Sequence, residues 1–250
     1  MTNLYIVATP IGNLEDITLR ALRILKEVDF IICEDTRVTS KLLAHYQIKK
    51  PLVSYFQHSK SSRVEEIVSR LGRGESAALV TDAGTPGISD PGGMLVSQVI
   101  RQLGNQVTVM PIPGPSAVAA ALSISGLPAD SFLFLGFPPH KKGRQKFWQK
   151  VAECKETVVF YESRYRITKA LDELGVILSV NEGYLAHASA SAEKLRDSSP
   201  AAHNDGGRRV LVCRELTKMF ESVYRGTIGE VAEMVAKDPQ KGEYVIVVGK

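Results

Sequence analysis

The chain has 250 residues, of which 44% are apolar and 23% are charged, and its formal net charge is +4. These proportions are ordinary for folded domains, so they exclude a wholly disordered chain. The longest stretch without a charged residue, from Gln102 to Ala129, contains four prolines and is therefore not expected to span a membrane. The small positive charge permits a nucleic-acid partner without requiring one.

The first residues show no basic region followed by a long apolar stretch, so no secretory signal is visible and we expect a cytoplasmic protein. The three cysteines, Cys33, Cys154 and Cys213, are far apart and lack Cys-x-x-Cys spacing. An odd number of cysteines in this pattern argues against a disulfide framework and against a zinc site. We therefore predict buried free thiols and no bound metal.

Short apolar runs alternate with helical patterns through the N-terminal half of the chain. The apolar runs predict strands at Leu4–Ala8, Phe30–Cys33, Leu52–Tyr55, Ala77–Thr81 and Val107–Met110. The helical patterns lie at Thr18–Glu27, Thr39–Tyr46, Arg63–Leu71 and Gly93–Leu103. This alternation predicts a mostly parallel sheet with helices on both faces.

Three prolines between Met110 and Pro115 interrupt the alternation. Because proline fits neither a helix interior nor a central strand, we place a boundary there, between domains 1–113 and 114–250. The second domain has predicted helices at Ser116–Ser123, Lys146–Ala152 and Ile167–Leu174, and predicted strands at Ser131–Leu135, Thr157–Tyr161, Val210–Cys213 and Tyr244–Val248. Residues 178–207 fit neither pattern and are predicted to form an irregular insertion. The fold class is α/β, with two α/β domains and mostly parallel or mixed sheets.

Several common sites are excluded because their motifs are absent: the GxxxxGK[ST] and GxGxxG phosphate loops, the GxSxG elbow and the HExxH zinc motif. What remains is a set of loops that follow predicted strands, where open α/β sheets bind their ligands. These loops cover residues 8–14, 33–37, 81–93 and 111–117.

The loop at 81–93 contains four glycines and two prolines, and Asp82 follows its strand directly. Glycines let main-chain amides approach a ligand closely, and the Asp82 carboxylate can accept hydrogen bonds from hydroxyl or ammonium groups. A tight turn in which these residues serve geometry alone is the alternative. In the loop at 33–37, Glu34, Asp35 and Arg37 are either functional or an ion pair that caps the next helix.

A basic segment without acidic residues runs from Ser131 to Ala152. Its cations are Lys141, Lys142, Arg144, Lys146 and Lys150. Phe147 and Trp148 lie among them, so the segment suits a phosphate backbone with an aromatic face for stacking. The alternative is a solvated helix face with Trp148 packed inward.

The loops together carry a specific signature. In chain order the motifs are Thr9-Pro-Ile-Gly-Asn-Leu14, Cys33-Glu-Asp-Thr-Arg37, Val80-Thr-Asp-Ala-Gly-Thr-Pro-Gly-Ile-Ser-Asp-Pro-Gly92, Pro111-Ile-Pro-Gly-Pro-Ser-Ala117, Arg214-Glu-Leu-Thr-Lys218, Arg225-Gly-Thr227 and Lys241-Gly-Glu243. This set closely resembles the tetrapyrrole methylase superfamily and, within it, the methyltransferases of small-subunit ribosomal RNA. The resemblance covers nearly the whole chain apart from roughly residues 178–207.

The resemblance implies two α/β domains with S-adenosyl-L-methionine in a cleft between them, and commonly a homodimer. The implied substrate is the 2′-hydroxyl of a cytidine in the decoding region of small-subunit (16S) ribosomal RNA. Carried onto this chain, the family's cofactor contacts fall on Pro10, Asp82, Ala83, Gly84, Thr85, Ser116, Ala117, Glu162 and Leu216. From the basic segment, independently of the resemblance, we expect RNA contacts at Lys141, Lys142, Arg144 and Lys146.

A 2′-hydroxyl is a weak acid, so a base or a nearby cation should assist its methylation. The candidates are Asp35, Glu215 and Lys218, with Arg37 holding a phosphate or orienting Asp35. The chain departs from the family at Tyr55-Phe-Gln-His-Ser-Lys60, where the family is rich in histidine, and at Glu162-Ser-Arg-Tyr-Arg166, where the family has Glu-Ser-Pro-His-Arg. Two alternatives therefore stay open, a small-molecule (tetrapyrrole) methyltransferase and a non-catalytic RNA- or ribosome-binding member.

Overall fold

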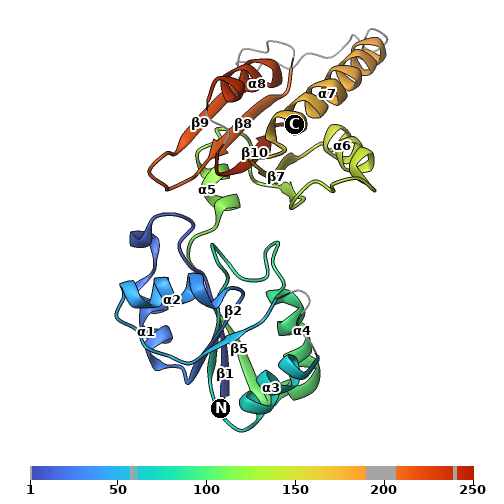
Figure 1. Cartoon of the computed structure of the whole chain (residues 1–250). Helices are drawn as coiled ribbons and strands as arrows, with labels where there is room; N and C mark the ends of the chain where they lie inside the picture. Colours follow the sequence, from blue (N-terminus) through green and yellow to red (C-terminus); the bar gives the residue numbers. More distant parts are fainter. Residues whose placement is uncertain (1, 57–58, 60, 190–206, 239–240) are drawn as a thin grey trace. The chain divides into compact units, whose positions relative to one another are not determined.

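The structure is a computed structural model that describes residues 2–56, 59, 61–189, 207–238 and 241–250 (Figure 1). Contacts within the chain divide it into two compact units, Met1–Ala117 and Val118–Lys250, which we call unit 1 and unit 2. The boundary expected from the proline-rich segment lies slightly earlier, after residue 113. Each unit is built around its own sheet.

Unit 1 contains a five-stranded sheet in which every pairing is parallel, in the order β3-β2-β4-β1-β5. The strands are β1 (Thr2–Val7), β2 (Phe30–Cys33), β3 (Leu52–Ser54), β4 (Ala77–Leu79) and β5 (Val107–Ile112). All residues of β2 and β4 are buried, as expected for strands with both faces covered. Because the strands are parallel, the loops that follow them emerge at one edge of the sheet.

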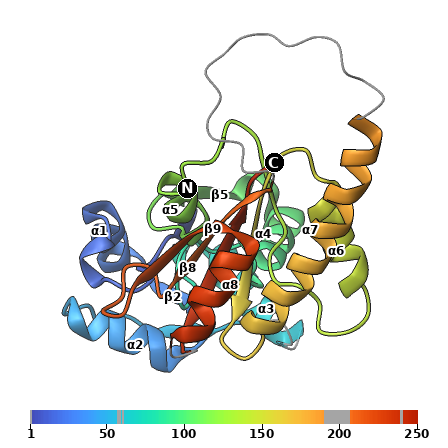
Figure 2. The same ribbon diagram turned by 90° about the horizontal axis from the view of Figure 1, so that it is seen from above.

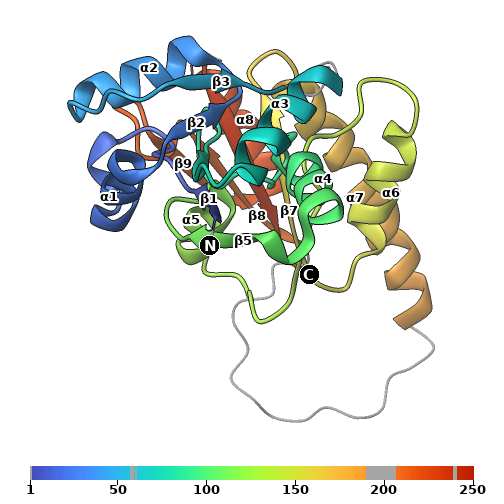
Figure 3. The same cartoon turned by 90° about the horizontal axis from the view of Figure 1, so that it is seen from below.

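Helices cover both faces of this sheet, as Figure 3 shows. Leu25 of α1 (Leu19–Glu27) and Leu43 of α2 (Thr36–His45) pack with Ile31 in one buried cluster. On the other face, α3 (Ser61–Gly72) and α4 (Gly92–Leu103) pack against the sheet in a second cluster. Two short 3₁₀ helices, at Leu14–Asp16 and Gly104–Gln106, complete the unit.

Unit 2 contains a mixed sheet in the order β6-β7-β10-β8-β9, with only β6 and β7 parallel. The strands are β6 (Phe132–Phe134), β7 (Thr157–Ser163), β8 (Arg209–Arg214), β9 (Ser222–Thr227) and β10 (Glu243–Val248). The helices are α5 (Ala117–Ser123), α6 (Arg144–Glu153), α7 (Ile167–Ser189) and α8 (Ile228–Lys237). Helix α7 lies between α6 and α8 (Figure 2), and the three share one buried cluster with the sheet. The predicted fold class is confirmed, with one parallel and one mixed sheet.

Three features of unit 2 differ from the sequence-based expectations or extend them. Strand β9 and helix α8 are not among the predicted elements, although Thr227 and Glu230 form a capping box at the start of α8. Of the irregular insertion predicted at 178–207, residues 178–189 continue helix α7. Residues 190–206 lie outside the described part of the chain.

Cys33 and Cys213 are buried and Cys154 is half-buried, and all three are free thiols. Among the described residues, no helix combines the length and the apolar character needed to cross a membrane. The same part of the chain holds no group of three or more His, Cys, Asp or Glu side chains arranged to bind a metal ion.

The capping box supports a first prediction. Replacing Thr227 with Ala removes the acceptor for the Glu230 main-chain amide and should lower the free energy of unfolding by about 1 kcal/mol. Urea denaturation followed by circular dichroism measures this change. Thr227→Ser keeps the hydroxyl and should stay close to wild type; equal losses in both variants would mean that the cap contributes nothing.

Candidate functional site

Thr9, immediately after β1, joins two of the strand-end loops of unit 1. Its main-chain amide donates to Gly84 O at 2.9 Å, and the Gly84 amide donates back to Thr9 O at 3.1 Å. The Thr9 hydroxyl donates to Thr81 O at 3.1 Å, and only 1% of Thr9 is exposed. The loop after β1 is therefore fixed to the glycine-rich loop after β4.

The proline-rich segment after β5 meets the same two loops. The Thr85 hydroxyl donates to Pro115 O at 3.1 Å. A Cβ built on Gly114 would lie 3.0 Å from the Ala8 Cβ, so a side chain there would crowd Ala8 where the two main chains approach each other. Gly84 has a φ of +87°, a conformation that glycine adopts without strain. Three loops thus converge where β4, β1 and β5 end side by side.

The seven cofactor contacts predicted for unit 1 all belong to these three loops. They are Pro10, Asp82, Ala83, Gly84, Thr85, Ser116 and Ala117. Asp82 and Ala83 are exposed, whereas Pro10 and Gly84 are buried beneath them. The loops thus place an exposed carboxylate beside buried main chain that hydrogen bonds hold in place. This arrangement suits a ligand that carries hydroxyl or ammonium donors.

Carboxylates gather at this edge of the sheet. The Asp35 amide donates to Asp82 Oδ1 at 3.3 Å, which joins the loop after β2 to the glycine-rich loop. Desolvation raises the pKa of Asp82, and the Asp35 charge adds to the effect. Desolvation likewise raises the pKa of Glu34, with further contributions from the charges of Asp82, Asp90 and Asp35. Both carboxyls hold a proton more tightly than usual.

Asp35 and Arg37 form the ion pair that the sequence allowed as an alternative. Asp35 caps α2 by accepting from the Arg37 amide at 2.8 Å, and its Oδ2 pairs with Arg37 Nη2 at 2.6 Å. The hydrogen bonds from the Arg37 side chain and main chain lower the pKa of Asp35 to about 2. The Arg37 side chain is 87% exposed, so its guanidinium remains accessible to an anion.

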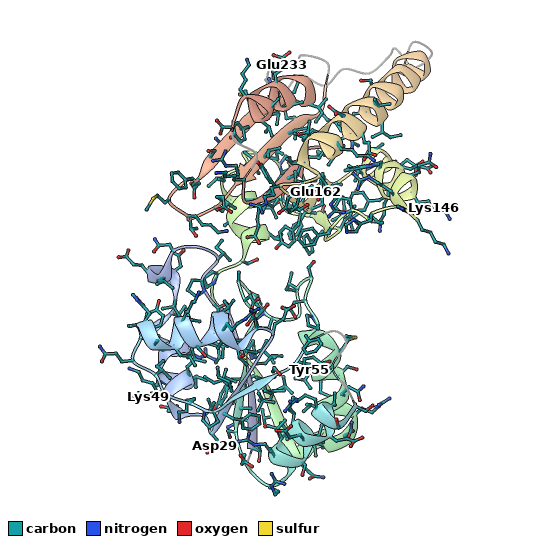
Figure 4. The ribbon with its side chains drawn as sticks, in the orientation of Figure 1. Asp29, Lys49, Tyr55, Lys146, Glu162 and Glu233 are labelled. Atoms are coloured by element: carbon teal, nitrogen blue, oxygen red, sulfur yellow. The ribbon has the colours of Figure 1, made fainter. Side chains whose placement is uncertain are left out.

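In unit 2, Glu162 is fully buried near the end of β7, and Figure 4 labels it among the side chains of this unit. Its Oε1 accepts from the Ser163 amide at 2.7 Å and pairs with Arg166 Nη2 at 2.9 Å. Its Oε2 has no hydrogen-bond partner among the described residues. The Glu162 side chain therefore anchors the turn that follows β7 and has no exposed surface in this structure.

Glu215 and Lys218 lie in a tight turn after β8, next to the buried Leu216. Lys218 Nζ pairs with Glu215 Oε1 at 2.8 Å and with Glu243 Oε2 at 3.1 Å. Despite partial burial, these contacts lower the pKa of Glu215 and raise that of Lys218, so both are charged at neutral pH. A Cβ on Gly242 would lie 2.3 Å from the Glu215 side chain, so glycine is required to seat this pair.

The basic segment separates into exposed lysines and a buried arginine. Lys141, Lys142 and Lys146 are exposed, and Lys146 points away from α6 in Figure 4. Arg144 is only 8% exposed; its Nη2 pairs with Glu173 Oε2 at 2.6 Å and its Nη1 donates to Pro139 O at 3.0 Å. This burial does not support the predicted contact of Arg144 with RNA. Arg144 instead fastens α6 to α7.

Trp148 follows the inward-packed alternative. It is 5% exposed, and its indole N–H donates to Glu173 Oε2 at 2.8 Å. Its ring is therefore closed to base stacking. An open groove of about 1120 Å³ runs beside it, lined by both α6 and α7.

Several residues that shape the site are not among the predicted site residues. Thr9 and Gly114 join the loops, Asp90 accepts from the Gly87 and Gly92 amides at 2.8 and 2.6 Å, and Glu243 completes the Lys218 cluster. Each belongs to a motif of the signature, so its place in the motif was visible in the sequence. Its contacts join segments distant in the chain or fix a turn, which the motif alone does not reveal.

The chain matches known proteins over nearly its whole length. A family model described as tetrapyrrole (corrin/porphyrin) methylases matches residues 3–232. A protein of Halalkalibacterium halodurans named ribosomal RNA small subunit methyltransferase I is 42% identical over 98% of this chain and 75% of its own length. The chain belongs to the tetrapyrrole methylase family. The resemblance drawn from the motifs is thereby confirmed.

Further relatives in the family carry the same name. The protein of Xylella fastidiosa is 44% identical, over 98% of this chain and 80% of the relative. That of Thermotoga maritima is 38% identical over 99% of this chain and 98% of the relative.

Solved structures of other methyltransferases share the fold at low sequence identity. Cobalt precorrin-4 methyltransferase, a cobalamin biosynthetic enzyme, matches with a TM-score of 0.64 at 18% identity, over 99% of this chain and 94% of that one. Uroporphyrin-III C-methyltransferase of Thermus thermophilus, solved with S-adenosyl homocysteine, matches with a TM-score of 0.59 at 20% identity, over 99% of this chain and 97% of that one.

The raised pKa of Asp82 gives a second prediction. A carboxyl whose pKa is higher in the folded protein than its usual value of 3.8 destabilises the fold as the pH rises through the folded-state pKa. Asp82→Asn keeps an oxygen acceptor and removes the charge. It should raise the melting temperature by about 1–3 °C at pH 7 and leave it unchanged near pH 3.

Thermal unfolding at both pH values measures this difference. Asp130→Asn, at an exposed position in unit 2, is the matched control. A variant less stable than wild type at pH 7 would contradict the electrostatic account of Asp82.

Proposed function

We propose that this protein transfers the methyl group of S-adenosyl-L-methionine to small-subunit ribosomal RNA, at the 2′-hydroxyl of a cytidine. The carrying observation is the loop convergence at Thr9 in a chain 42% identical to a protein named ribosomal RNA small subunit methyltransferase I. The motif resemblance supports the finer statement about the cytidine 2′-hydroxyl. A ribosomal substrate places the proposed reaction in the cytoplasm, and we extend the proposal to a homodimer.

The three loops of unit 1 fit the proposed cofactor by the chemistry of their donor set. The exposed Asp82 carboxylate would accept hydrogen bonds from ribose hydroxyls or from an ammonium group, while the fixed main chain at Pro10 and Gly84 would line the ligand. Thr85, Ser116 and Ala117 would complete the contacts of unit 1. In unit 2 the full burial of Glu162 does not support its predicted contact, and Leu216 is kept as a proposed contact. When bound, the cofactor supplies a methyl group that is already activated by a positive sulfur.

The remaining task of the protein is to hold the 2′-oxygen in line with that methyl group and to assist loss of its proton. Asp35, with a pKa of about 2, is a poor base, and its proposed task is to hold Arg37 for a phosphate. Glu215 is equally unsuited to take up a proton because its pKa is lowered. Lys218 stays cationic, so we assign it the stabilisation of negative charge on the oxygen, whose proton would leave to solvent water as the methyl group is transferred.

A labelling experiment tests the proposed function directly. The purified protein is incubated with radiolabelled S-adenosylmethionine and either small ribosomal subunits that lack the modification or a porphyrinoid. We expect label in the RNA, recovered as 2′-O-methylcytidine after digestion to nucleosides. Label in the porphyrinoid would favour the small-molecule alternative, and label in neither would favour a non-catalytic RNA-binding member. Light scattering tests the homodimer.

The third prediction concerns Asp82 and the cofactor. Asp82→Ala should weaken the binding of S-adenosyl homocysteine about ten-fold or more, because a hydrogen bond to a charged acceptor is lost. Isothermal titration calorimetry measures the dissociation constant, and Asp130→Ala serves as a control far along the chain. An unchanged affinity would remove Asp82 from the cofactor site.

The fourth prediction concerns the exposed lysines. Replacing Lys141, Lys142 and Lys146 with Gln should reduce affinity for a single-stranded fragment of small-subunit RNA and lower the slope of log affinity against log salt by up to about 2. The control removes the same charge at three other exposed lysines, Lys26, Lys49 and Lys237. Equal effects in the two triple variants would mean that the lysines of the basic segment act only through the general positive charge of the protein.

A further inference from the structure

Two loops of unit 2 expose aromatic rings at neighbouring strand ends. Strands β6 and β7 are parallel and paired, so the loops that follow them emerge at the same edge, and the Tyr161 amide donates to Gly136 O at 2.9 Å. The first loop carries Phe137, which is 51% exposed, and the second carries Tyr165, which is 79% exposed. Large rings this exposed bury little area within the fold, so the fold alone does not account for them.

Arg166 fastens these two loops to each other. Its Nη1 donates to Pro138 O at 3.1 Å, and its Nη2 pairs with the buried Glu162 at 2.9 Å. The carbonyl lies next to Phe137 and the arginine next to Tyr165. Both rings therefore lie on turns that the ion pair between Arg166 and Glu162 holds in place.

Neighbouring groups support each ring and leave it accessible. The Arg164 guanidinium carbon lies 4.6 Å from the centre of the Tyr165 ring, and the guanidinium also donates to the Tyr165 hydroxyl. Phe137 lies beside Tyr161, with ring centres 5.3 Å apart. An arginine against an aromatic ring is a common support for a stacked nucleic-acid base.

The charge around the rings favours RNA over an apolar protein surface. From Ser131 to Ala152 and from Ser163 to Leu171 the sequence holds no acidic residue, and Glu243, which lies opposite Ser163 on β10, is paired with Lys218. Arg164 is exposed beside the rings, and Lys141 and Lys142 are exposed a few residues after Phe137. A polyanion is attracted to such a surface, whereas an apolar partner would have to desolvate these cations.

We propose that Phe137 and Tyr165, supported by Arg164, form a platform on which unpaired bases of the RNA substrate stack. The inference rests on the proposed function, because methylation of a 2′-hydroxyl favours a nucleotide that has left the regular helix. The platform would position the RNA and take no part in the chemical step. It gives the departure from the family at Arg164 and Tyr165 a role in substrate binding.

The test measures binding of a single-stranded oligoribonucleotide from small-subunit RNA that contains one 2-aminopurine, together with methylation kinetics on small ribosomal subunits. Tyr165→Ala and Phe137→Ala should each weaken RNA binding about ten-fold and abolish the quenching of 2-aminopurine fluorescence that stacking causes. The KM for RNA should rise, whereas the KM for S-adenosylmethionine and the salt dependence of RNA binding should stay at wild-type values. Tyr165→Trp should restore binding, because it keeps a ring for stacking.

Phe132→Ala, at the opposite end of β6 and 43% exposed, is the matched control. Methylation by wild type with unchanged RNA affinity in Tyr165→Ala would overturn the platform alone. A shift in oligomeric state in that variant, seen by light scattering, would also overturn it and assign the surface to a second copy of the chain. Ring-dependent RNA binding without methylation would overturn the proposed function and leave the platform standing, and no binding by wild type would overturn both.

Discussion

Thr9 holds the loops of the candidate site in unit 1 together, because its main chain and its hydroxyl both form hydrogen bonds with the loop after β4. The paired amides and carbonyls of Thr9 and Gly84 act as a short bridge beyond the end of the sheet. This bridge is possible only because β1 lies between β4 and β5, so that the three loops have a common origin. The close approach of Gly114 to Ala8 then brings in the third loop. The site in unit 1 is in this sense a consequence of strand order.

The same strand order concentrates negative charge. Glu34, Asp35 and Asp82 follow neighbouring strands, and two of them hold protons more tightly because of desolvation and mutual repulsion. Such crowding of carboxylates opposes folding. It is typical of functional sites, where a ligand with hydrogen-bond donors would relieve the repulsion between the carboxylates. Asp35 is the exception, because hydrogen bonds from Arg37 lower its pKa. The Asp35 carboxylate is therefore engaged in the ion pair with Arg37, whereas the exposed Asp82 carboxylate remains available to a ligand.

How far the sequence predicted the fold depended on the type of strand. The strands of the parallel sheet were all predicted, most clearly β2 and β4, because burial of every residue makes these two continuous apolar runs, as in Phe30–Cys33. Strand β9 was missed because it lies at the sheet edge, has few apolar residues and contains Gly226. In the site, the motifs located the loops but not their partners. No pattern in the sequence connects Arg144 with Glu173, which lies on another helix.

The basic segment shows why charge in a sequence does not translate directly into a binding surface. Arginine presents a planar fork that can satisfy a carboxylate and a carbonyl together, and Arg144 uses it to join Glu173 to Pro139. The neighbouring lysines carry a compact, strongly hydrated charge on a flexible stem, and they stay in solvent. Fixing α6 through Arg144 and Trp148 determines on which side of the helix Lys146 is exposed. The arginine and the tryptophan would thus contribute to the proposed RNA binding only indirectly, by orienting a surface that they do not themselves form.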